Sequence, residues 1–356
     1  MNPPASLLLA WYDQHRRILP WRALSGQVAD PYHVWLSEIM LQQTTVTAVI
    51  PYFQKFLERF PDIAALAKAS VDDVLSQWAG LGYYSRARNL HRCAQTVHEM
   101  GGFPRDPAGL QALPGIGLYT AAAIASIAFD VPVVPVDGNV ERVVSRIFAV
   151  EDELPRARPR LAALAVRFMD DQDAVARPAD FAQALFDLGA GLCSPRSPAC
   201  VICPWQSSCA AFRRGDAASF PRKAPKAARP VKYGQHFLLS DGRGQILLRR
   251  RPDKGLLGGT LELPGGSWTL ERPEGDAASV APLADRCAME WRRCGEVKHV
   301  FTHFELRVEV WAAHVPVLPN LREEDGMAVP EAKVGELALS SLMRKCLEMA
   351  KRKEDI

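Results

Sequence analysis

The chain has 356 residues, of which 48% are hydrophobic and 23% charged, a composition that excludes wholesale disorder. This length exceeds what a single core ordinarily supports, so two domains are expected. The formal net charge of +3 excludes a uniformly positive field as the means of binding nucleic acid, so local patches or backbone amides would have to do so. No apolar run approaches membrane-spanning length and no secretory segment forms, so we expect an intracellular, cytoplasmic protein.

Residues 3 to about 210 are predicted to be helical, because short Pro and Gly breaks separate the segments and no alternating strands interrupt them. Asp30 and Pro31 form an N-cap and first-turn pair, which predicts a helix through Leu41. Within it, Glu38 has no cation three or four residues away, although helix glutamates are ordinarily solvated or paired. An acid among apolar neighbours is expected to have a raised pKa, and a protonated carboxyl can act as a general acid.

A second motif joins two helical segments. Asp106 and Pro107 predict a helix start, and the turn 113–117 precedes a helix from Leu118 to about Phe129. Gly115 and Gly117 permit positive φ and leave backbone N–H groups uncovered at a helix N-terminus, where a phosphate oxygen could bind. An ordinary tight turn between helices is the alternative, because Pro-Gly-x-Gly is common in turns.

Asp137 precedes a predicted helix with an apolar stripe formed by Val140, Val143, Val144, Ile147 and Phe148. An isolated Asp at this position is ordinarily a helix N-cap. A carboxylate can also stabilise the cationic sugar that forms when an N-glycosidic bond breaks, or trap it covalently. Asp137 can have both roles.

Four of the eight cysteines follow the pattern Cys193-x6-Cys200-x2-Cys203-x5-Cys209, which lets four thiolates surround one metal centre. Disulfides are disfavoured because the chain is large and predicted to be cytosolic. Zinc remains open, although structural zinc sites usually have two paired Cys-x2-Cys arms and only one is present here. An iron-sulfur cluster accepts the uneven spacing.

Residues 213–232 carry seven cations and one anion without an evident apolar face, which predicts a linker that follows an oppositely charged partner. Beyond it the hydrophobic period becomes two. Segments 236–240 and 245–250 flank an Asp-Gly-Arg-Gly turn and predict a hairpin, and residues 304–310 alternate between apolar and charged side chains. The second domain is therefore expected to be a sheet-based α+β unit.

The cysteine run, the glycine turn and the loop bearing Asp137 together resemble the endonuclease III superfamily, and specifically the MutY-type adenine DNA glycosylases. The resemblance implies an all-α helix-hairpin-helix glycosylase domain with a 4Fe-4S loop, followed by an α+β Nudix-like domain. The implied boundaries are a glycosylase domain at 1–212 with its hairpin at 113–117 and iron-sulfur loop at 193–209, a basic linker at 213–232, a Nudix-like lesion-recognition domain at 233–345 and a charged tail at 346–356.

The resemblance also assigns roles to individual residues. The catalytic group is Glu38 as the acid, Asp137 beside the sugar, Tyr119, and Asn139 orienting water and aspartate. The implied adenine pocket contains Arg17, Arg22 and Gln183, whose amide could pair with adenine. Contacts to DNA fall on Gln43 and Tyr83, inserted where the base leaves the stack, and on Gly115 and Gly117. The 8-oxoguanine reader is Phe301, Thr302 and His303, and one 4Fe-4S cluster would be bound by Cys193, Cys200, Cys203 and Cys209.

Four features of the sequence refine what the resemblance implies. Tyr119 stands where bifunctional relatives have a lysine that forms a Schiff base, so a monofunctional enzyme is expected. Glu141 replaces a family lysine, which puts a phosphate contact or covalent trapping there in doubt, and Thr302 replaces a serine while keeping the hydroxyl. Residues 254–266 resemble the start of a Nudix-like domain, but residues 267–295 lack its Arg-Glu and Glu-Glu metal-binding series, so pyrophosphatase chemistry is not expected.

From these features the sequence predicts a monofunctional DNA glycosylase that hydrolyses the N-glycosidic bond of adenine mispaired with 8-oxoguanine or guanine. The expected partner is double-stranded DNA with an A:8-oxoguanine or A:G mispair, and we expect a nucleoid-associated monomer without membrane contact. Two alternatives stay open: an endonuclease III-like pyrimidine glycosylase and lyase, opposed by Tyr119, and a non-catalytic iron-sulfur DNA-binding sensor, opposed by Glu38 and Asp137.

Overall fold

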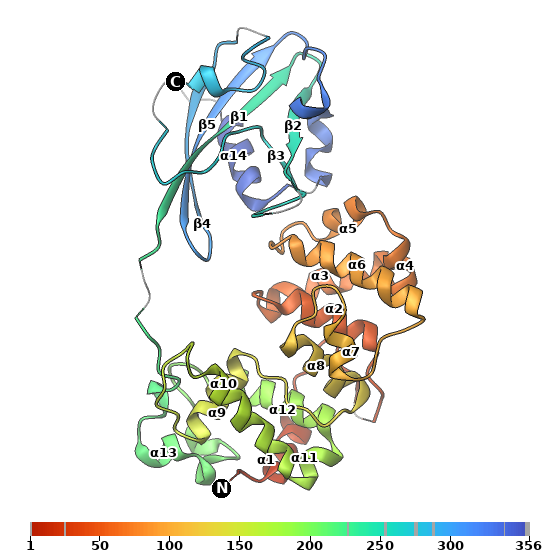
Figure 1. Ribbon diagram of the computed structural model, residues 1–356, viewed down its shortest axis with the longest axis vertical. Helices are drawn as coiled ribbons and strands as arrows, with labels where there is room; N and C mark the ends of the chain where they lie inside the picture. The colour runs from red at the N-terminus through yellow and green to blue at the C-terminus, as the bar shows by residue number, and fades with distance from the viewer. Residues whose placement is uncertain are drawn as a thin grey trace. The chain divides into compact units, whose positions relative to one another are not determined.

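A computed structural model describes residues 2–24, 26–225, 228–252, 255–273, 277–286, 289–337 and 339–352 of the chain. Lys226 of the predicted linker, Lys254 of the Nudix-like segment and Cys287 lie outside the described residues. The chain divides into two compact units (Figure 1). The first contains Met1–Lys68 and Asn89–Lys226, and the second contains Ala69–Arg88 and Ala227–Ile356.

The first unit is helical, as predicted. The α-helices that precede the linker, including α5 of the second unit and α6, which begins there, are α1 (Ala5–His15), α2 (Pro31–Leu41), α3 (Val46–Arg59), α4 (Ile63–Lys68), α5 (Val71–Gln77), α6 (Ser85–Met100), α7 (Pro107–Gln111), α8 (Leu118–Phe129), α9 (Gly138–Ile147), α10 (Arg158–Val166), α11 (Gln172–Ala176), α12 (Pro178–Gly191) and α13 (Ala210–Arg214). Single 3₁₀ turns lie at Arg167–Asp170, Cys200–Ile202, Gln206–Ser208 and Ala217–Ser219.

The predicted helix starts are confirmed by their capping bonds. Asp30 accepts a hydrogen bond from the Tyr32 amide at 2.8 Å, and Asp106 accepts one from the Gly109 amide at 2.9 Å. Each side chain therefore satisfies a backbone N–H that has no partner within its helix. The helix predicted from Leu118 to Phe129 is also confirmed, as α8.

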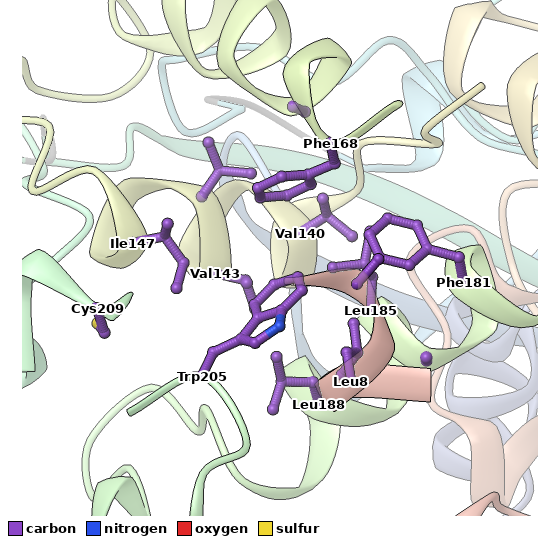
Figure 2. Close-up of a cluster of buried hydrophobic side chains, with 14 of the residues drawn as sticks. Leu8, Val140, Val143, Ile147, Phe168, Phe181, Leu185, Leu188, Trp205 and Cys209 are labelled. Carbon is purple, nitrogen blue, oxygen red and sulfur yellow. The ribbon is translucent and has the colours of Figure 1, made fainter. Parts of the chain in front are cut away.

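The core of the first unit joins the N-terminal helix to the cysteine loop. Trp205, which lies between Cys203 and Cys209, is fully buried and packs among residues of α1, α9 and α12 (Figure 2). Its indole Nε1 donates to the Pro4 carbonyl at 2.9 Å, so the polar end of this ring is also satisfied. The cysteine loop is therefore fixed to the helical core by a large aromatic side chain.

The segment predicted as a linker begins inside the first unit. Phe220 is 1% exposed and belongs to the same core, and the guanidinium of Arg222 lies 4.5 Å from the centre of its ring. The Leu154 amide donates to the Arg222 carbonyl at 2.9 Å, which fixes the backbone there. The prediction that residues 213–232 have no apolar face is wrong at Phe220, because a single aromatic among cations gave no periodic signal in the sequence.

The second unit contains a sheet, as predicted. Its described strands are β1 (Val231–Asp241), β2 (Gln245–Arg250), β3 (Leu261–Glu262), β4 (Arg292–Val300), β5 (Glu305–Val315) and β6 (Met327–Pro330). They follow the order β3-β2-β1-β5-β4, with β6 paired to β2, and β1 runs parallel to β5. The alternation predicted for residues 304–310 is confirmed, because Leu306, Val308 and Val310 are buried.

One face of the sheet is covered by α14 (Ser341–Lys351), which packs on β1, β4 and β5. Cys346 and Ala350 of this helix are buried, so the charged tail predicted from residue 346 begins inside α14. The prediction of a charged tail overlooked Leu342, Cys346 and Ala350, which recur every four residues, the spacing of a buried helix face. Among the described helices, none combines the length and the hydrophobicity that crossing a bilayer requires.

Candidate active site

A cavity of about 590 Å³ lies in the first unit and is lined by residues of α2, α8, α9 and α12. Both α2 and α12 pack against α8, and α12 also packs against α9, which brings residues from distant parts of the sequence to one place. The predicted site residues that line this cavity are Arg17, Arg22, Glu38, Gln43, Tyr119, Asp137, Asn139 and Gln183. Apolar side chains such as Trp21 and Phe186 complete the lining, which suits a pocket for a small aromatic group.

Glu38 is buried in the wall of this cavity. Its side chain projects from α2, the residue is 6% exposed, and its Oε2 atom has no hydrogen-bond partner among the described residues. Burial raises the pKa of Glu38 to about 7; the nearby Asp137 also raises it, while a hydrogen bond from Tyr119 and the charge of Arg22 lower it. The raised pKa predicted from the neighbours of Glu38 is therefore confirmed. A carboxyl with this pKa is partly protonated at neutral pH and can donate a proton.

Asp137 is the N-cap of α9. Its Oδ1 accepts hydrogen bonds from the amides of Asn139 and Val140 at 2.9 and 2.8 Å. Its Oδ2 accepts a third bond, from the Asn139 Nδ2 at 2.8 Å. The capping role predicted for an isolated Asp is confirmed, and the same bonds fix the orientation of the carboxylate at the cavity.

The turn 113–117 has one glycine in the left-handed region. Gly115 has φ +78°, and a Cβ there would also lie 2.7 Å from the Cβ of Asn89. Gly117 has φ −92°, so of the two glycines only Gly115 uses the positive φ that a glycine permits. Gly117 is instead the N-cap of α8 without a side-chain cap bond, and both glycines are exposed. The backbone at this helix N-terminus is therefore accessible to an anion.

The residues predicted to contact the base are fixed by neighbouring groups. Asp187 is 3% exposed and accepts two hydrogen bonds from the Arg22 guanidinium at 2.8 Å each, plus one from Arg17 Nε at 2.6 Å. Although burial opposes it, the bonds and charge of Arg22 hold the pKa of Asp187 below its usual value. Gln183 donates to the Ala179 carbonyl one turn earlier in α12, at 3.2 Å.

The four cysteines of the predicted metal centre line one small cavity, together with Arg146 and Trp205. Among the described residues, no three His, Cys, Asp or Glu side chains form a group that could hold a single metal ion. Each thiol of a 4Fe-4S site instead binds a different iron at the periphery of the cluster, which suits four sulfurs spaced around a cavity. Arg146 Nη1 donates to Cys193 Sγ at 3.2 Å, which places a positive charge beside one of these sulfurs.

In the second unit, the predicted lesion-reading residues lie beside Tyr83. Phe301 stacks on Trp268 with ring centres 5.9 Å apart, and Thr302 and His303 are exposed. The hydroxyl oxygens of Thr302 and Tyr83 are 2.6 Å apart, within hydrogen-bond distance. Tyr83, Phe301, Thr302 and His303 line a cavity of about 390 Å³ in the second unit. The structure therefore groups Tyr83 with the lesion-reading residues, whereas Gln43, its predicted partner in DNA, lines the first unit's cavity.

An acid must be protonated to donate a proton, so the Glu38 pKa of about 7 predicts how the rate of a reaction that uses this group depends on pH. We expect the single-turnover rate to be highest below pH 7 and to fall about tenfold per pH unit well above it, since the acid form is depleted in that range. Measuring single-turnover rates between pH 5.5 and 9 tests this. A rate that is independent of pH between 7 and 9 would remove Glu38 as the proton donor.

Comparison with known proteins agrees with this geometry. Residues 36–166 match the family described as HhH-GPD superfamily base excision DNA repair protein, and residues 235–349 match the NUDIX domain. The structure of a thermostable thymine-DNA glycosylase is 29% identical with a TM-score of 0.51, covering 59% of this chain and 95% of that one. An adenine DNA glycosylase of Mus musculus is 36% identical over 97% of this chain and 77% of its own length. This chain belongs to the adenine DNA glycosylase family.

Further relatives agree with this assignment. An adenine DNA glycosylase of Buchnera aphidicola (subsp. Baizongia pistaciae, strain Bp) is 35% identical over 70% of each chain. The Homo sapiens adenine DNA glycosylase is 37% identical, and this chain spans 65% of its length. The family and its base excision repair domain make this protein a DNA N-glycosylase, a hydrolase. The predicted helix-hairpin-helix and Nudix-like organisation is confirmed as well.

Two residues of this adenine DNA glycosylase were not found by sequence reasoning. The first is Asp187, which joins Arg17 and Arg22. The second is Arg142, whose Nη2 donates to Asn139 Oδ1 at 2.9 Å and to the Gly189 carbonyl at 2.6 Å, while its Nε donates to the Cys193 carbonyl at 2.8 Å. Asn139 and Arg142 are three residues apart on one helix, and this spacing could have indicated their contact from the sequence.

Glu141, which stands where the resemblance implied a lysine, has an ion-pair partner in the structure. Arg158 Nε donates to Glu141 Oε1 at 3.0 Å, which joins α9 to α10. Glu141 does not appear among the residues that line the 590 Å³ cavity. An anion at this position would repel a phosphate, and the partner of Glu141 in the structure is an arginine of the protein itself.

Proposed function

We propose that this adenine DNA glycosylase is monofunctional and hydrolyses adenine from pairs with 8-oxoguanine or guanine. The observation that carries the proposal is Glu38, which is buried in the cavity wall with a pKa of about 7 and whose Oε2 has no hydrogen-bond partner in the described part of the chain. In the proposed reaction Glu38 donates its proton to a ring nitrogen of adenine. The C1′–N9 bond then breaks, and its electron pair leaves with the base.

Asp137 is proposed to stabilise the cationic sugar that remains. Asn139 supports this role by donating to Asp137 Oδ2 at 2.8 Å while accepting from Arg142, which fixes the amide orientation. Water then adds to C1′ and releases a proton, which leaves an abasic site. Tyr119 donates a hydrogen bond to Glu38, and burial raises its pKa well above its usual value. Its side chain has no amine, so it cannot form the Schiff base of a lyase.

Arg17, Arg22 and Gln183 are proposed to surround the extruded adenine. Asp187 forms ion pairs with both arginines and offsets one of their two charges, so neither guanidinium would be left without a partner when a neutral base enters. The amide of Gln183 could exchange its bond to the Ala179 carbonyl for one to the base. Extrusion of adenine would be supported by Gln43 and Tyr83, which lie in loops, are exposed and have positive φ.

The remaining contacts to the duplex are assigned by the same proposal. The uncovered backbone at Gly115 and Gly117 would bind a phosphate and fix the register of the protein without reading sequence. Phe301, Thr302 and His303 would read 8-oxoguanine or guanine, with the Thr302 hydroxyl as the polar group. An enzyme that acts on genomic DNA would work inside the cell, at the nucleoid in a bacterium, and we propose that it acts as a monomer.

We propose one 4Fe-4S cluster bound by Cys193, Cys200, Cys203 and Cys209, which line a common cavity. When bound, the cluster would cross-link the loop 193–209 through four thiolate bonds. We expect purified protein to contain iron and sulfide in equal amounts and to absorb broadly in the visible blue. Metal and sulfide analysis of protein purified without oxygen measures this. Zinc without iron or sulfide would contradict the cluster.

Strand nicking with and without alkali tests the proposed function. We expect a duplex with A opposite 8-oxoguanine to be cut at the adenine only after alkali, because a monofunctional enzyme leaves an intact abasic strand. A:G should behave in the same way, and A:T is the matched control for a correct pair. Cutting without alkali, or of a damaged pyrimidine instead, would support the lyase. An intact strand under all conditions would support the non-catalytic sensor.

A further inference from the structure

The segment Ala69–Arg88 interrupts the helical region in sequence, yet it clusters with the C-terminal residues in the second unit. It contains α5 and the loop that carries Tyr83. Its contacts with residues 227–356 therefore lie within a single compact unit. The proposed wedge and the proposed lesion reader thus share one structural body.

An ion pair joins this segment to the sheet. Arg250, the last residue of β2, donates from Nη1 to Asp72 Oδ1 at 3.1 Å and from Nη2 to Asp72 Oδ2 at 3.2 Å. The two parallel bonds match the planar guanidinium to the carboxylate. Arg250 Nη1 also donates to the Gly259 carbonyl at 3.0 Å. This bond does not involve Asp72 and fixes the orientation of the guanidinium. The Tyr84 hydroxyl adds a buried bond to the Leu339 carbonyl at 3.2 Å.

From Asp72 the contacts continue to Tyr83. Trp78 immediately follows α5, and its Nε1 donates to the Gly82 carbonyl at 3.0 Å. The guanidinium of Arg86 lies 5.2 Å from the Trp78 ring centre and 5.5 Å from that of Tyr83. Tyr83 has φ +49°, a conformation that costs free energy for an aromatic residue. Contacts with neighbouring residues have to offset that cost. The position of α5 therefore affects the position of Tyr83.

We propose that the Arg250–Asp72 ion pair positions Tyr83 for insertion into the duplex. The Nudix-like domain then supports base extrusion itself, whichever base lies opposite adenine, in addition to reading 8-oxoguanine. Asp72 and Arg250 are positioning residues, since neither touches the reacting atoms. The inference rests on the proposed wedge role of Tyr83. Because both side chains of the pair are exposed, we expect its loss to reduce extrusion only roughly two- to fivefold.

The test uses the full chain and a duplex with 2-aminopurine beside the mispaired adenine, whose fluorescence rises when the base unstacks. Asp72→Asn and Arg250→Gln should each lower the fluorescence rise and the single-turnover rate by a similar factor on A:G and A:8-oxoguanine. The double variant should lower the fluorescence rise and the rate no further than either single variant, because each substitution removes the same ion pair. The reversed pair, Asp72→Arg with Arg250→Asp, should recover at least half of the loss.

The matched control is the exposed Arg160–Asp152 pair, 2.5 Å apart in the first unit. Arg160→Gln and Asp152→Asn should leave both signals at the wild-type level.

Wild-type fluorescence in both single variants, with melting temperatures confirming that they fold, would overturn the inference. A loss confined to A:8-oxoguanine would also overturn it, because that result indicates lesion reading without a wedge effect. Additive losses in the combined variant would mean that the two residues act separately, which contradicts a shared ion pair. A wild-type enzyme that releases no adenine from either duplex would instead refute the proposed function.

Discussion

Replacing Glu38 with glutamine is expected to abolish adenine release, with a loss of roughly 10²- to 10⁴-fold or more in the single-turnover rate. The amide has the shape of the carboxyl and can still accept the hydrogen bond from Tyr119, but it has no proton to donate. Binding to an A:8-oxoguanine duplex should be retained, because the pocket keeps its volume and its arginines. Rapid-quench single-turnover assays and a binding titration measure the two quantities.

The stability of Glu38→Gln distinguishes lost chemistry from lost structure. The folded-state pKa of Glu38 is raised from 4.5 to about 7, so the folded state binds the proton more tightly. The wild-type free energy of unfolding therefore receives this contribution in full below pH 4.5 and loses it as the pH rises through 7. Glutamine removes this dependence, so the variant should be at least as stable as the wild type at pH 8. A near-normal rate in a well-folded variant would exclude Glu38 from the chemistry.

Replacing Asp137 with asparagine is expected to lower the single-turnover rate by roughly 10²- to 10³-fold or more, because the charge that stabilises the sugar cation is lost. Asparagine is as good an N-cap as aspartate, and its oxygen can accept from the amides of Asn139 and Val140. Stability should therefore change little, although the bond from Asn139 Nδ2 would lack an acceptor at the second position. Thermal unfolding and single-turnover rates separate the two roles.

Asp137→Ser is the matched control for capping, since serine also caps helices but has no carboxylate. It should be as inactive as Asp137→Asn while α9 remains folded. Retained activity in either variant would reduce Asp137 to a cap. If the variants lose activity only because they unfold, Asp137 would likewise be a helix cap without a role in the chemistry.

The helix starts and the buried acid Glu38 were predictable from the sequence, because the patterns that indicate them involve residues within one or two helical turns. The Asp-Pro pairs at residues 30 and 106 have a capping mechanism that operates over one turn, and both helices begin there. The apolar neighbours of Glu38 at helical spacing indicated its burial before the tertiary structure was known. The stripe after Asp137 likewise predicted both the helix and its cap.

Features that depend on contacts between distant residues were not predictable. Asp187 is separated from Arg17 by 170 residues, and only the packing of α12 brings them together. Phe220 reads as part of a basic linker, since nothing near it in sequence indicates that it enters the core. The ion pair that joins α5 to β2 connects Asp72 and Arg250, which are 178 residues apart. Such pairs leave no periodic pattern in a single sequence.

The central claim concerns two carboxyl groups acting on opposite sides of one bond. The most direct test is a crystal structure of Glu38→Gln bound to a duplex with A opposite 8-oxoguanine. The account predicts that the side-chain amide at position 38 lies within hydrogen-bond distance of a ring nitrogen of the extruded adenine, while the Asp137 carboxylate faces C1′ of its sugar. Adenine in another pocket, or Asp137 turned away from C1′, would contradict it.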